Sequence, residues 1–519
     1  MQTPTLAHKG HPPALFILFF TEMWERFSYY GMRALLVLFL VSSVMGDNPG
    51  WGWERAEALQ LYAFYTGLVY LTPIIGGWIA DRFTGYRKAV ILGALIMTIG
   101  HASMALDTPF WFYTGLVCLI LGNGLFKPNI SSIVGQLYKH DSDKKDSACT
   151  IFYMGINAGA FLGILLCGYI GEKVGWSWGF GLAGIFMLLG MLQFTFAQKI
   201  FGTIGLSPKK EEELAHENEH ANPVTEELVV ESHQSKKVTR DRIFVILVFS
   251  IFTIFFWMAF EQAGGSMTIF AKDYTDRILT GSSATIFKWV NSAIVVVAMI
   301  ILTVVLINLF KKTFKKYALS NTFLGLAFLI IWGIVIWKLN REFQDNITEV
   351  PASWFSILNS FFIISLAPLF SRVWESKLNP SGPVKFGLGL VLLGVGFAIL
   401  AYGGLPIEQG AKTASVSIVW LILAYLFHTM GELCVSPVGL SYISKLSPVK
   451  MVGLMFGLWF AASAVANMLA GLTGSLIDRI TANYSISIFF MIFAFIPIAA
   501  GIIMFILNKS LVKKMHGIH

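Results

Sequence analysis

The most constraining feature of this sequence is a series of long apolar stretches. About 20 apolar residues cross the hydrocarbon core of a bilayer as one helix, and stretches of this length recur along most of the 519 residues. Charged residues make up 13% of the chain and mean hydropathy is +0.67, which excludes a large soluble enzyme. The sequence predicts an all-α, polytopic membrane protein with fourteen transmembrane helices near 14–44, 56–80, 88–106, 110–135, 148–170, 178–200, 242–270, 285–310, 319–339, 352–371, 386–403, 416–444, 451–477 and 485–508.

A polar tract divides these helices into two groups. Six helices precede it and eight follow, which predicts two bundles of six and one extra pair, as in transporters built from two halves. The extra pair carries few polar groups, so we expect it at the periphery, without residues in a central cavity. The predicted organisation is an N-terminal six-helix bundle at 1–200, a cytoplasmic linker at 201–241, the first helix of the C-terminal bundle at 242–274, the extra transmembrane hairpin at 275–340 and the remainder of that bundle at 341–519.

Positive charge is arranged by side of the membrane. The formal net charge is +8, and Lys and Arg gather in alternate loops. The positive-inside rule places these loops and both termini in the cytoplasm, so the charge needs no nucleic-acid partner. The first apolar segment is too long for a cleavable signal and lacks a cleavage site. We expect a multi-pass protein of the cytoplasmic membrane.

The first apolar stretch carries an unusual set of charges. Glu22, Glu25, Arg26 and Arg33 share one side of a helix with Tyr29 and Tyr30, within an arc of about 140°. A charge at the bilayer centre costs about 2.5–3.5 kcal/mol on insertion scales, so such residues mark an ion or substrate path. The alternative is a self-neutralising patch that only holds helices together.

Further polar residues lie at membrane depth in later stretches. The first half contributes the bases Arg33 and Lys127, whereas the second half contributes the acids Glu261 and Glu432. This division suits a short zwitterion, with its carboxylate toward the two bases and its amine toward Glu432. Alternatives stay open for three residues: Lys127 snorkels to an interface, Asn157 hydrogen-bonds another helix, or Glu432 forms an ion pair that holds two bundles together. The other polar and aromatic residues at this depth include Trp257, Asn359, Ser436 and Trp459.

Metal and cysteine chemistry are weakly supported. His216, Glu217 and His220 match H-E-x-x-H, but inside an acidic polar tract that is better explained as a solvated charge run. The four cysteines show no metal spacing, and we expect neither a metal nor an organic cofactor. His101 and His428 either tune protons or pack between helices.

Three motifs carry a resemblance to a known family. Residues 22–31 match E-x-x-E-R-F-x-Y-Y-G, residues 152–159 match a second signature, and residues 431–441 match G-E-L-x-x-S-P-x-G-L-S. In these motifs and their order the chain resembles the proton-dependent oligopeptide transporter family of the major facilitator superfamily, bacterial type. The likeness covers nearly the whole length.

The resemblance implies a major facilitator fold of two six-helix bundles plus an extra helical hairpin, functional as a monomer in the lipid bilayer. It implies a secondary transporter rather than an enzyme, which imports di- and tripeptides, and peptide-like drugs, by alternating access with protons as the coupling ion. The proton-coupling residues would be Glu22, Glu25, Arg26, Glu261 and Glu432, and the gate pairs Arg33 with Glu261 and Lys127 with Glu432. The peptide-contacting residues would be Tyr29, Tyr30, Arg33, Tyr70, Lys127, Asn157, Trp257, Asn359, Glu432, Ser436 and Trp459.

The sequence departs from the family in two places, and rival functions stay open. The extra pair follows the helix of Trp257 instead of separating the two bundles, and Phe260 precedes Glu261 where some relatives have a second acid. A non-peptide substrate such as histidine or nitrate is the nearest alternative. An intramembrane hydrolase would need a nucleophile with a base, or a metal pair, at membrane depth, and a nutrient receptor would need a signalling domain; both functions are less well supported by this sequence.

Overall fold

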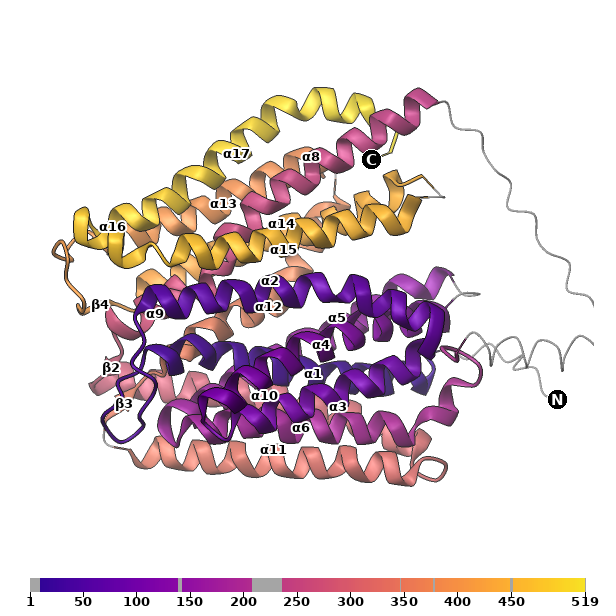
Figure 1. Cartoon of the computed structure of the whole chain (residues 1–519), viewed down its shortest axis with the longest axis horizontal. Helices are drawn as coiled ribbons and strands as arrows, with labels where there is room; N and C mark the ends of the chain where they lie inside the picture. Colours follow the sequence, from indigo (N-terminus) through magenta and orange to yellow (C-terminus); the bar gives the residue numbers. More distant parts are fainter. Residues whose placement is uncertain are drawn as a thin grey trace, which may run out of the picture. The chain divides into compact units, whose positions relative to one another are not determined.

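The computed structural model describes residues 10–138, 142–207, 236–345, 347–376, 379–448 and 451–518, and these are nearly all helical (Figure 1). The predicted all-α class is confirmed. The H-E-x-x-H match lies outside the described residues. The long helices are α1 (Pro13–Val41), α2 (Arg55–Ile79), α3 (Gly85–Met104), α4 (Pro109–Leu137), α5 (Ser142–Lys173), α6 (Trp176–Phe196), α8 (Lys236–Phe260), α10 (Gly281–Thr313), α11 (Ala318–Gln344), α12 (Ile357–Glu375), α13 (Gly382–Gly403), α14 (Val419–Leu446), α15 (Val452–Gly474) and α17 (Ile486–Lys514).

Shorter elements join the long helices. A π-helical turn, η1 (Ala80–Thr84), links α2 to α3, and the 3₁₀ turns are η2 (Gln198–Phe201), η3 (Glu261–Gly264) and η4 (Ala352–Ser356). Two short helices, α9 (Ser266–Asp273) and α16 (Ile477–Asn483), lie at helix connections. Strand β1 (Thr275–Asp276) pairs in parallel with β4 (Val416–Ser417), and β2 (Ile278–Leu279) pairs antiparallel with β3 (Thr348–Glu349).

The chain forms two compact units. Unit 1 contains Met1–Met32, Thr72–His220 and Ile278–Val350, and unit 2 contains Arg33–Leu71, Ala221–Arg277 and Pro351–His519. The boundaries fall inside α1 and α2, so each of these helices contributes to both units. Charged residues of α1 are therefore divided between two sites.

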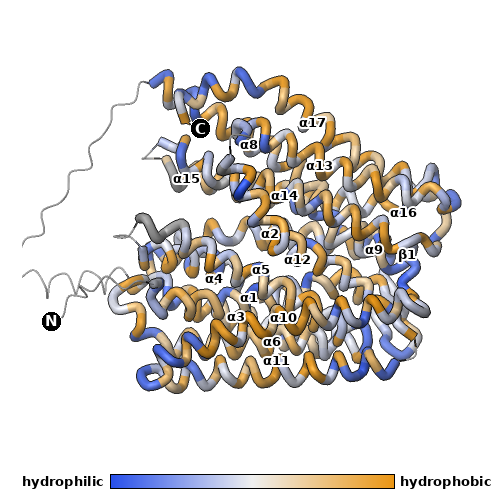
Figure 2. The backbone as a smooth tube through the Cα atoms, turned by 180° about the vertical axis from the view of Figure 1, so that it is seen from behind, coloured by the Kyte–Doolittle hydropathy of each residue, from blue (hydrophilic) through white to orange (hydrophobic). Residues whose placement is uncertain are grey.

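Most of the long helices have the length and the hydropathy needed to cross a membrane. Twelve stretches of the described residues are long and apolar enough to cross a membrane, and one of them, Arg55–Met104, contains both α2 and α3. Helix α1 is not among them, and it carries four charged residues. In α11 the hydrophobic residues occupy the middle and the hydrophilic residues gather near the ends (Figure 2). This is the pattern that a bilayer imposes on a spanning helix.

The predicted helix at 242–270 corresponds to one candidate span, Lys236–Asp273, but this span is not one continuous α-helix. Helix α8 ends at Phe260, η3 follows, and α9 begins only at Ser266. The residues between them include Gly264 and Gly265, which lower the stability of a continuous helix. Because long apolar runs lie on both sides of this segment, hydropathy alone does not reveal the break.

Small residues set the packing of α1 against α5 in unit 1. A side chain at Gly155, Gly159 or Gly163 would collide with Phe19, with Met23 and Arg26, or with Phe27, respectively. The glycines recur every four residues and so form one face of α5, as in the small-residue interfaces of membrane helices. This close contact fixes the face of α1 that carries the charges.

The extra hairpin, α10 and α11, belongs to unit 1. Helix α11 lies beside α6 (Figure 1), and the hydroxyl of Ser320 donates a hydrogen bond of 2.8 Å to the carbonyl of Gln193. An aromatic core joins α1, α6 and α11: the Trp24 ring stacks on Phe186 with centroids 4.9 Å apart and meets Phe328 edge-on at 5.8 Å.

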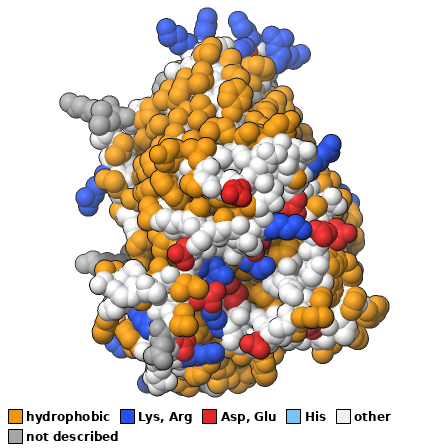
Figure 3. Space-filling model, turned by 90° about the vertical axis from the view of Figure 1, so that its left-hand side faces the viewer, with side chains coloured by type: hydrophobic (Ala, Val, Ile, Leu, Met, Phe, Trp, Pro, Cys, Tyr) orange, Lys and Arg blue, Asp and Glu red, His pale blue; other side chains and the backbone are white. Residues whose placement is uncertain are grey.

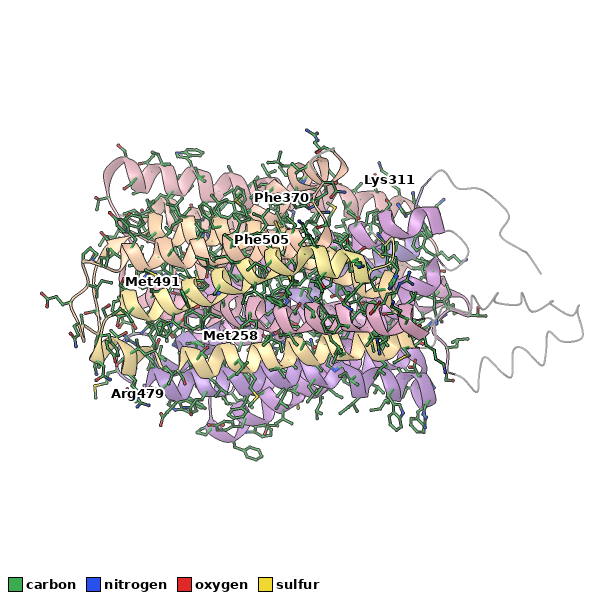
Figure 4. The ribbon with its side chains drawn as sticks, turned by 90° about the horizontal axis from the view of Figure 1, so that it is seen from above. Met258, Lys311, Phe370, Arg479, Met491 and Phe505 are labelled. Atoms are coloured by element: carbon green, nitrogen blue, oxygen red, sulfur yellow. The ribbon has the colours of Figure 1, made fainter. Side chains whose placement is uncertain are left out.

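Unit 2 is built around α8, α13, α14, α15 and α17. Helices α13 and α17 approach closely at Gly387 and Gly501, where an added side chain would meet the backbone of the other helix. Figure 4 shows Met491 and Phe505 on α17 and Met258 on the neighbouring α8. The Phe505 ring lies against Gly387. Glycine packing again determines the spacing of the helices.

Candidate functional site

A buried acid and arginine cluster lies on α1 in unit 1. Arg26 Nε is 2.9 Å from a carboxylate oxygen of Glu22, one turn earlier, and is also ion-paired with Glu25. All three residues are at most 3% exposed. The second oxygen of Glu22 has no hydrogen-bond partner among the described residues. Two carboxylates therefore share one arginine at membrane depth, where separated charges are costly.

Helix α4 supplies polar support for this cluster. The side-chain amide of Asn123 donates a hydrogen bond of 2.9 Å to Glu25. Lys127 lies one turn later on α4 and interacts electrostatically with both Glu22 and Glu25. The two acids, Glu22 and Glu25, are thus balanced by the two bases, Arg26 and Lys127. A proton added to either carboxylate would leave the group with a net charge of +1.

Tyr29 and Tyr30 lie next to Arg26, whereas Asn157 forms its hydrogen bond within its own helix. The Arg26 guanidinium carbon is 5.5 Å from the centre of the Tyr29 ring, and the rings of Tyr29 and Tyr30 meet edge-on at 5.1 Å. Asn157 is buried, and its amide donates to the carbonyl of Tyr153 on its own helix at 3.0 Å.

A second charged group lies in unit 2, where Arg33 from the later part of α1 meets Glu261. The two side chains form an ion pair, and Arg33 Nε donates a hydrogen bond of 2.6 Å to the hydroxyl of Tyr62 on α2. The residues are 9%, 4% and 0% exposed, respectively. A side chain at Gly264 would collide with the Tyr62 hydroxyl. A glycine at this position therefore makes room for the pair.

The break after α8 places Glu261. Because η3 follows α8 directly, Glu261 is the first residue beyond the α-helix. The neighbouring Gln262 anchors this turn: its amide donates to the carbonyl of Ala470 at 2.7 Å, and its carbonyl accepts from Ser266 at 2.6 Å. The orientation of the acid is thus fixed by hydrogen bonds to α15 and α9.

A separate ionic network centres on Arg55 at the start of α2. Its guanidinium contacts Asp273 at 2.8 Å, Asp478 at 2.9 Å and the Tyr274 hydroxyl at 3.1 Å, and donates to the carbonyl of Lys412 at 2.7 Å. Burial raises the pKa of the Tyr274 hydroxyl, which stays neutral. One arginine therefore connects α2 to the end of α9, α16 and the loop after α13.

Glu432 on α14 lies beside Asn359 on α12. The Asn359 amide donates to Glu432 at 2.9 Å and to the Thr429 hydroxyl at 3.2 Å. In the described part of the chain no basic side chain of unit 2 forms an ion pair with Glu432. A carboxylate held by an amide alone keeps acceptor capacity for an incoming ammonium group.

Aromatic and hydroxyl groups occupy other positions of unit 2. The Trp257 ring meets Phe256 and Phe260 edge-on at 5.3 and 5.1 Å. Trp459 is 5% exposed and fits against Gly439, where any side chain would collide with the indole. Ser436 lies one turn after Glu432, and its buried hydroxyl has no hydrogen-bond partner among the described residues. Tyr70 lies about two turns after Tyr62 on α2.

Comparison with known proteins decides the family. The sequence model of the POT family matches residues 87–215 and 330–494, which is more than half of the chain. The chain belongs to the POT family.

Characterised relatives and solved structures agree with this assignment. The chain is 33% identical to a di-/tripeptide transporter of Lactococcus lactis subsp. cremoris over 98% of its length and 97% of the relative. It is 32% identical to the peptide transporter YePEPT of Yersinia enterocolitica, over 90% and 88%. A crystal structure of a peptide transporter of this family in complex with sulfate superposes with a TM-score of 0.74 at 28% identity, covering 99% of this chain and 98% of the other. This POT family member is therefore a membrane transporter and not an enzyme.

Several residues singled out in the sequence are brought together. Glu22, Glu25 and Arg26 form one cluster, Arg33 pairs with Glu261, and Asn359 contacts Glu432. Their functional roles stay predictions. Lys127 belongs to unit 1 and Glu432 to unit 2, so the proposed pairing of these two residues also stays a prediction.

Sequence reasoning missed three contributors to the sites. Tyr62, Thr429 and the Arg55 network were not predicted. A tyrosine or threonine inside an apolar helix gives no distinctive pattern, because such residues are common in membrane helices. Arg55 also gives no local signal, because the two acids that it contacts are 423 and 218 residues away in the sequence.

Proposed function

We propose that this POT family member is a proton-coupled symporter that imports di- and tripeptides by alternating access. The observation that carries the proposal is the pattern of charges within the apolar helices, with a buried acid and arginine cluster in one unit and a half-buried carboxylate, Glu432, held by an amide in the other. Relatives with 32–33% identity are named peptide transporters. Buried ionisable residues of this kind serve proton relays and substrate sites in membrane transporters.

The substrate site would use the two ends of a peptide. Arg33 and Lys127 would attract the carboxylate, and Glu432, oriented by Asn359, would accept hydrogen bonds from the amine. Tyr29, Tyr30, Tyr70, Asn157, Trp257, Ser436 and Trp459 would contact the peptide between these ends. A related POT transporter has been crystallised with 5-aminolevulinic acid, which also carries an amine and a carboxylate. Peptide-like drugs with both groups would be further substrates.

Proton coupling would act through carboxylates that are bound to bases. Protonation of Glu22 or Glu25 would release Arg26, and protonation of Glu261 would release Arg33. Glu432 would couple peptide binding to the same proton movement, and Lys127 with Glu432 would form the second gate pair. One charge moved across 100 mV supplies about 2.3 kcal/mol, enough for roughly fifty-fold accumulation of a peptide.

The membrane arrangement is proposed together with this mechanism. Twelve stretches meet the criteria for spanning; counting α2 and α3 separately and including α1 supports fourteen spans. The division into an N-terminal bundle at 1–200, a linker at 201–241 and a C-terminal bundle interrupted by the hairpin at 275–340 follows from that count. Both termini would lie in the cytoplasm, and the monomer would work in the cytoplasmic membrane with protons as the coupling ion and no cofactor.

Competition tests the substrate class. Uptake of labelled dialanine into proteoliposomes is measured with an excess of unlabelled dialanine, trialanine, histidine or nitrate. We expect the two peptides to inhibit uptake strongly and the other two compounds to have no effect. Inhibition by histidine or nitrate, without inhibition by trialanine, would assign the site to the non-peptide alternative.

A further inference from the structure

An apolar groove opens on unit 1 between α5, α6 and α11. Its volume is about 550 Å³, and all but one of its lining residues are apolar. Gly181 on α6 and Ala105, just after α3, are among the lining residues, and a Cβ atom added to Gly181 would lie 3.7 Å from the Ala105 Cβ. Ile185, Ile330 and Trp337 form part of the walls. Small residues therefore leave a hollow in a surface that faces the hydrocarbon region.

The length of the groove matches one leaflet of the bilayer. Along α6 it extends from Ser177 to Ile185, and eight residues of α-helix rise about 12 Å. One leaflet contributes about 15 Å of hydrocarbon. A single acyl chain lying along the helices fits this depth.

A polar pocket lies directly beyond the groove. It is lined by three bases and three acids, Lys173, Lys288, Arg341, Glu342, Asp345 and Glu349, together with Tyr169. The Trp337 ring, which lines the groove, is 6.2 Å from the Tyr169 ring and 5.6 Å from the Arg341 guanidinium carbon. The space-filling view also shows acidic and basic side chains interspersed at the end of the molecule that carries β3 (Figure 3). The apolar and polar parts thus adjoin across one tryptophan, an arrangement typical of the membrane interface.

Three of the six charged residues around the polar pocket are ion-paired. Lys173 is ion-paired with Glu349, and Lys338 contacts Glu342 at 2.6 Å. The side chains of Arg341 and Asp345 have no ion-pair partner among the described residues. Arg341 is half-buried and Asp345 is exposed. The third residue without an ion pair, Lys288, donates a hydrogen bond of 2.8 Å to the backbone carbonyl of Asp345. The Arg341 and Asp345 side chains therefore offer one cation and one anion next to each other, four residues apart on α11 and immediately after it.

We propose that this groove and pocket bind one phosphatidylethanolamine molecule of the bilayer. An acyl chain lies in the groove over Gly181, the phosphate accepts hydrogen bonds from Arg341, and the primary ammonium donates hydrogen bonds to Asp345. The bound lipid connects α5 and α6 with α11 and so fastens the extra hairpin to unit 1.

The headgroup assignment follows from charge balance. A cationic and an anionic side chain suit a zwitterion, whereas phosphatidylglycerol offers no cation for Asp345. Phosphatidylcholine carries the same formal charges, but its quaternary ammonium has no N–H donor. Phosphatidylethanolamine is the one of these three lipids that satisfies both side chains.

Native mass spectrometry of the purified full-length protein tests the site. The protein is titrated with phosphatidylethanolamine, phosphatidylcholine or phosphatidylglycerol of identical chains. Gly181→Leu fills the groove, and Gly135→Leu is the matched control, since it adds the same side chain to α4 where nothing lies within 4 Å and no groove residue is nearby in the sequence. We expect Gly181→Leu to weaken phosphatidylethanolamine binding about tenfold and Gly135→Leu to leave it unchanged. Equal affinities of the two variants would overturn the proposal.

Substitutions of the two residues proposed to bind the headgroup give a second test, which does not depend on filling the groove. We expect Arg341→Gln and Asp345→Asn each to reduce the preference for phosphatidylethanolamine over phosphatidylcholine about tenfold. The control Lys312→Gln, at the opposite end of the hairpin, should leave that preference intact. Wild-type protein that binds phosphatidylcholine or phosphatidylglycerol as tightly as phosphatidylethanolamine would overturn the headgroup assignment. Monodisperse elution and an unchanged thermal unfolding temperature establish that each variant is folded.

Discussion

The hydroxyl of Tyr62 accepts a 2.6 Å hydrogen bond from Arg33, whose guanidinium is also ion-paired with Glu261. The arginine is therefore held from two sides, by a neutral group on α2 and by an acid after the break in α8. Protonation of Glu261 would remove one restraint and leave the other. Tyr62 thus determines where Arg33 goes when the ion pair opens.

Removal of the Tyr62 hydroxyl tests this relationship. Tyr62→Phe keeps the ring but leaves the buried Nε of Arg33 without that acceptor, at an expected cost of about 1–3 kcal/mol. We expect peptide uptake to fall several-fold in proteoliposomes, while Tyr484→Phe, at an exposed tyrosine, has no effect. In a double-mutant cycle, the effects of Tyr62→Phe and Glu261→Gln should be non-additive. Simple additivity would show that the two restraints act independently.

The cluster of Glu22, Glu25 and Arg26 makes a prediction about coupling. Glu22→Gln and Glu25→Gln remove a carboxylate that can take up a proton, so we expect loss of concentrative uptake with preserved peptide counterflow. Glu57→Gln, at an exposed position in the first turn of α2, is the matched control. If both cluster variants still concentrate dialanine like the wild type, proton coupling lies elsewhere.

Glu432 makes a prediction about the peptide amine. Glu432→Gln replaces a charge-assisted hydrogen bond by a neutral one, which should weaken the affinity for dialanine about tenfold. N-acetyl-dialanine lacks the ammonium group, so its already weak inhibition should be nearly the same in wild type and variant. Glu408→Gln, in an exposed loop, should change neither value. An equal loss of affinity for both peptides would contradict a role of Glu432 in binding the amine.

The glycine face of α5 makes a prediction about stability. Gly159→Leu forces a side chain against the Met23 carbonyl and Arg26, and overpacking of this kind costs at least about 1–3 kcal/mol. Gly135→Leu on α4 adds the same atoms where nothing lies within 4 Å. Thermal unfolding in detergent should show a clear decrease for the first variant and little change for the second. Equal unfolding temperatures would mean that α1 and α5 separate without penalty.

Much of the helical framework could be predicted from apolar runs alone. The stretch near 319–339, for example, corresponds to α11 (Ala318–Gln344), since a bilayer requires about 20 apolar residues per span. The end of α8 at Phe260 could not be predicted in this way. Phe256, Phe260 and Phe270 lie on both sides of the break, so the apolar residues do not mark the point where the α-helix ends.

Contacts between site residues within one helix could be predicted from the sequence, whereas contacts between distant residues could not. Glu22, Glu25 and Arg26 are neighbours on one helix, and their contact follows from helical spacing. Arg33 and Glu261 are 228 residues apart, and only the family resemblance suggested their pairing. Tyr62 was missed because its role depends on tertiary packing around Gly264, which no local pattern records.

Labelled dialanine uptake into proteoliposomes, with an inward proton gradient or with that gradient collapsed by an ionophore, tests the central claim most directly. A proton–peptide symporter must concentrate dialanine inside the vesicles only while the gradient is present. Equal accumulation in both conditions, or no uptake by folded protein in either, would contradict proton-coupled peptide transport.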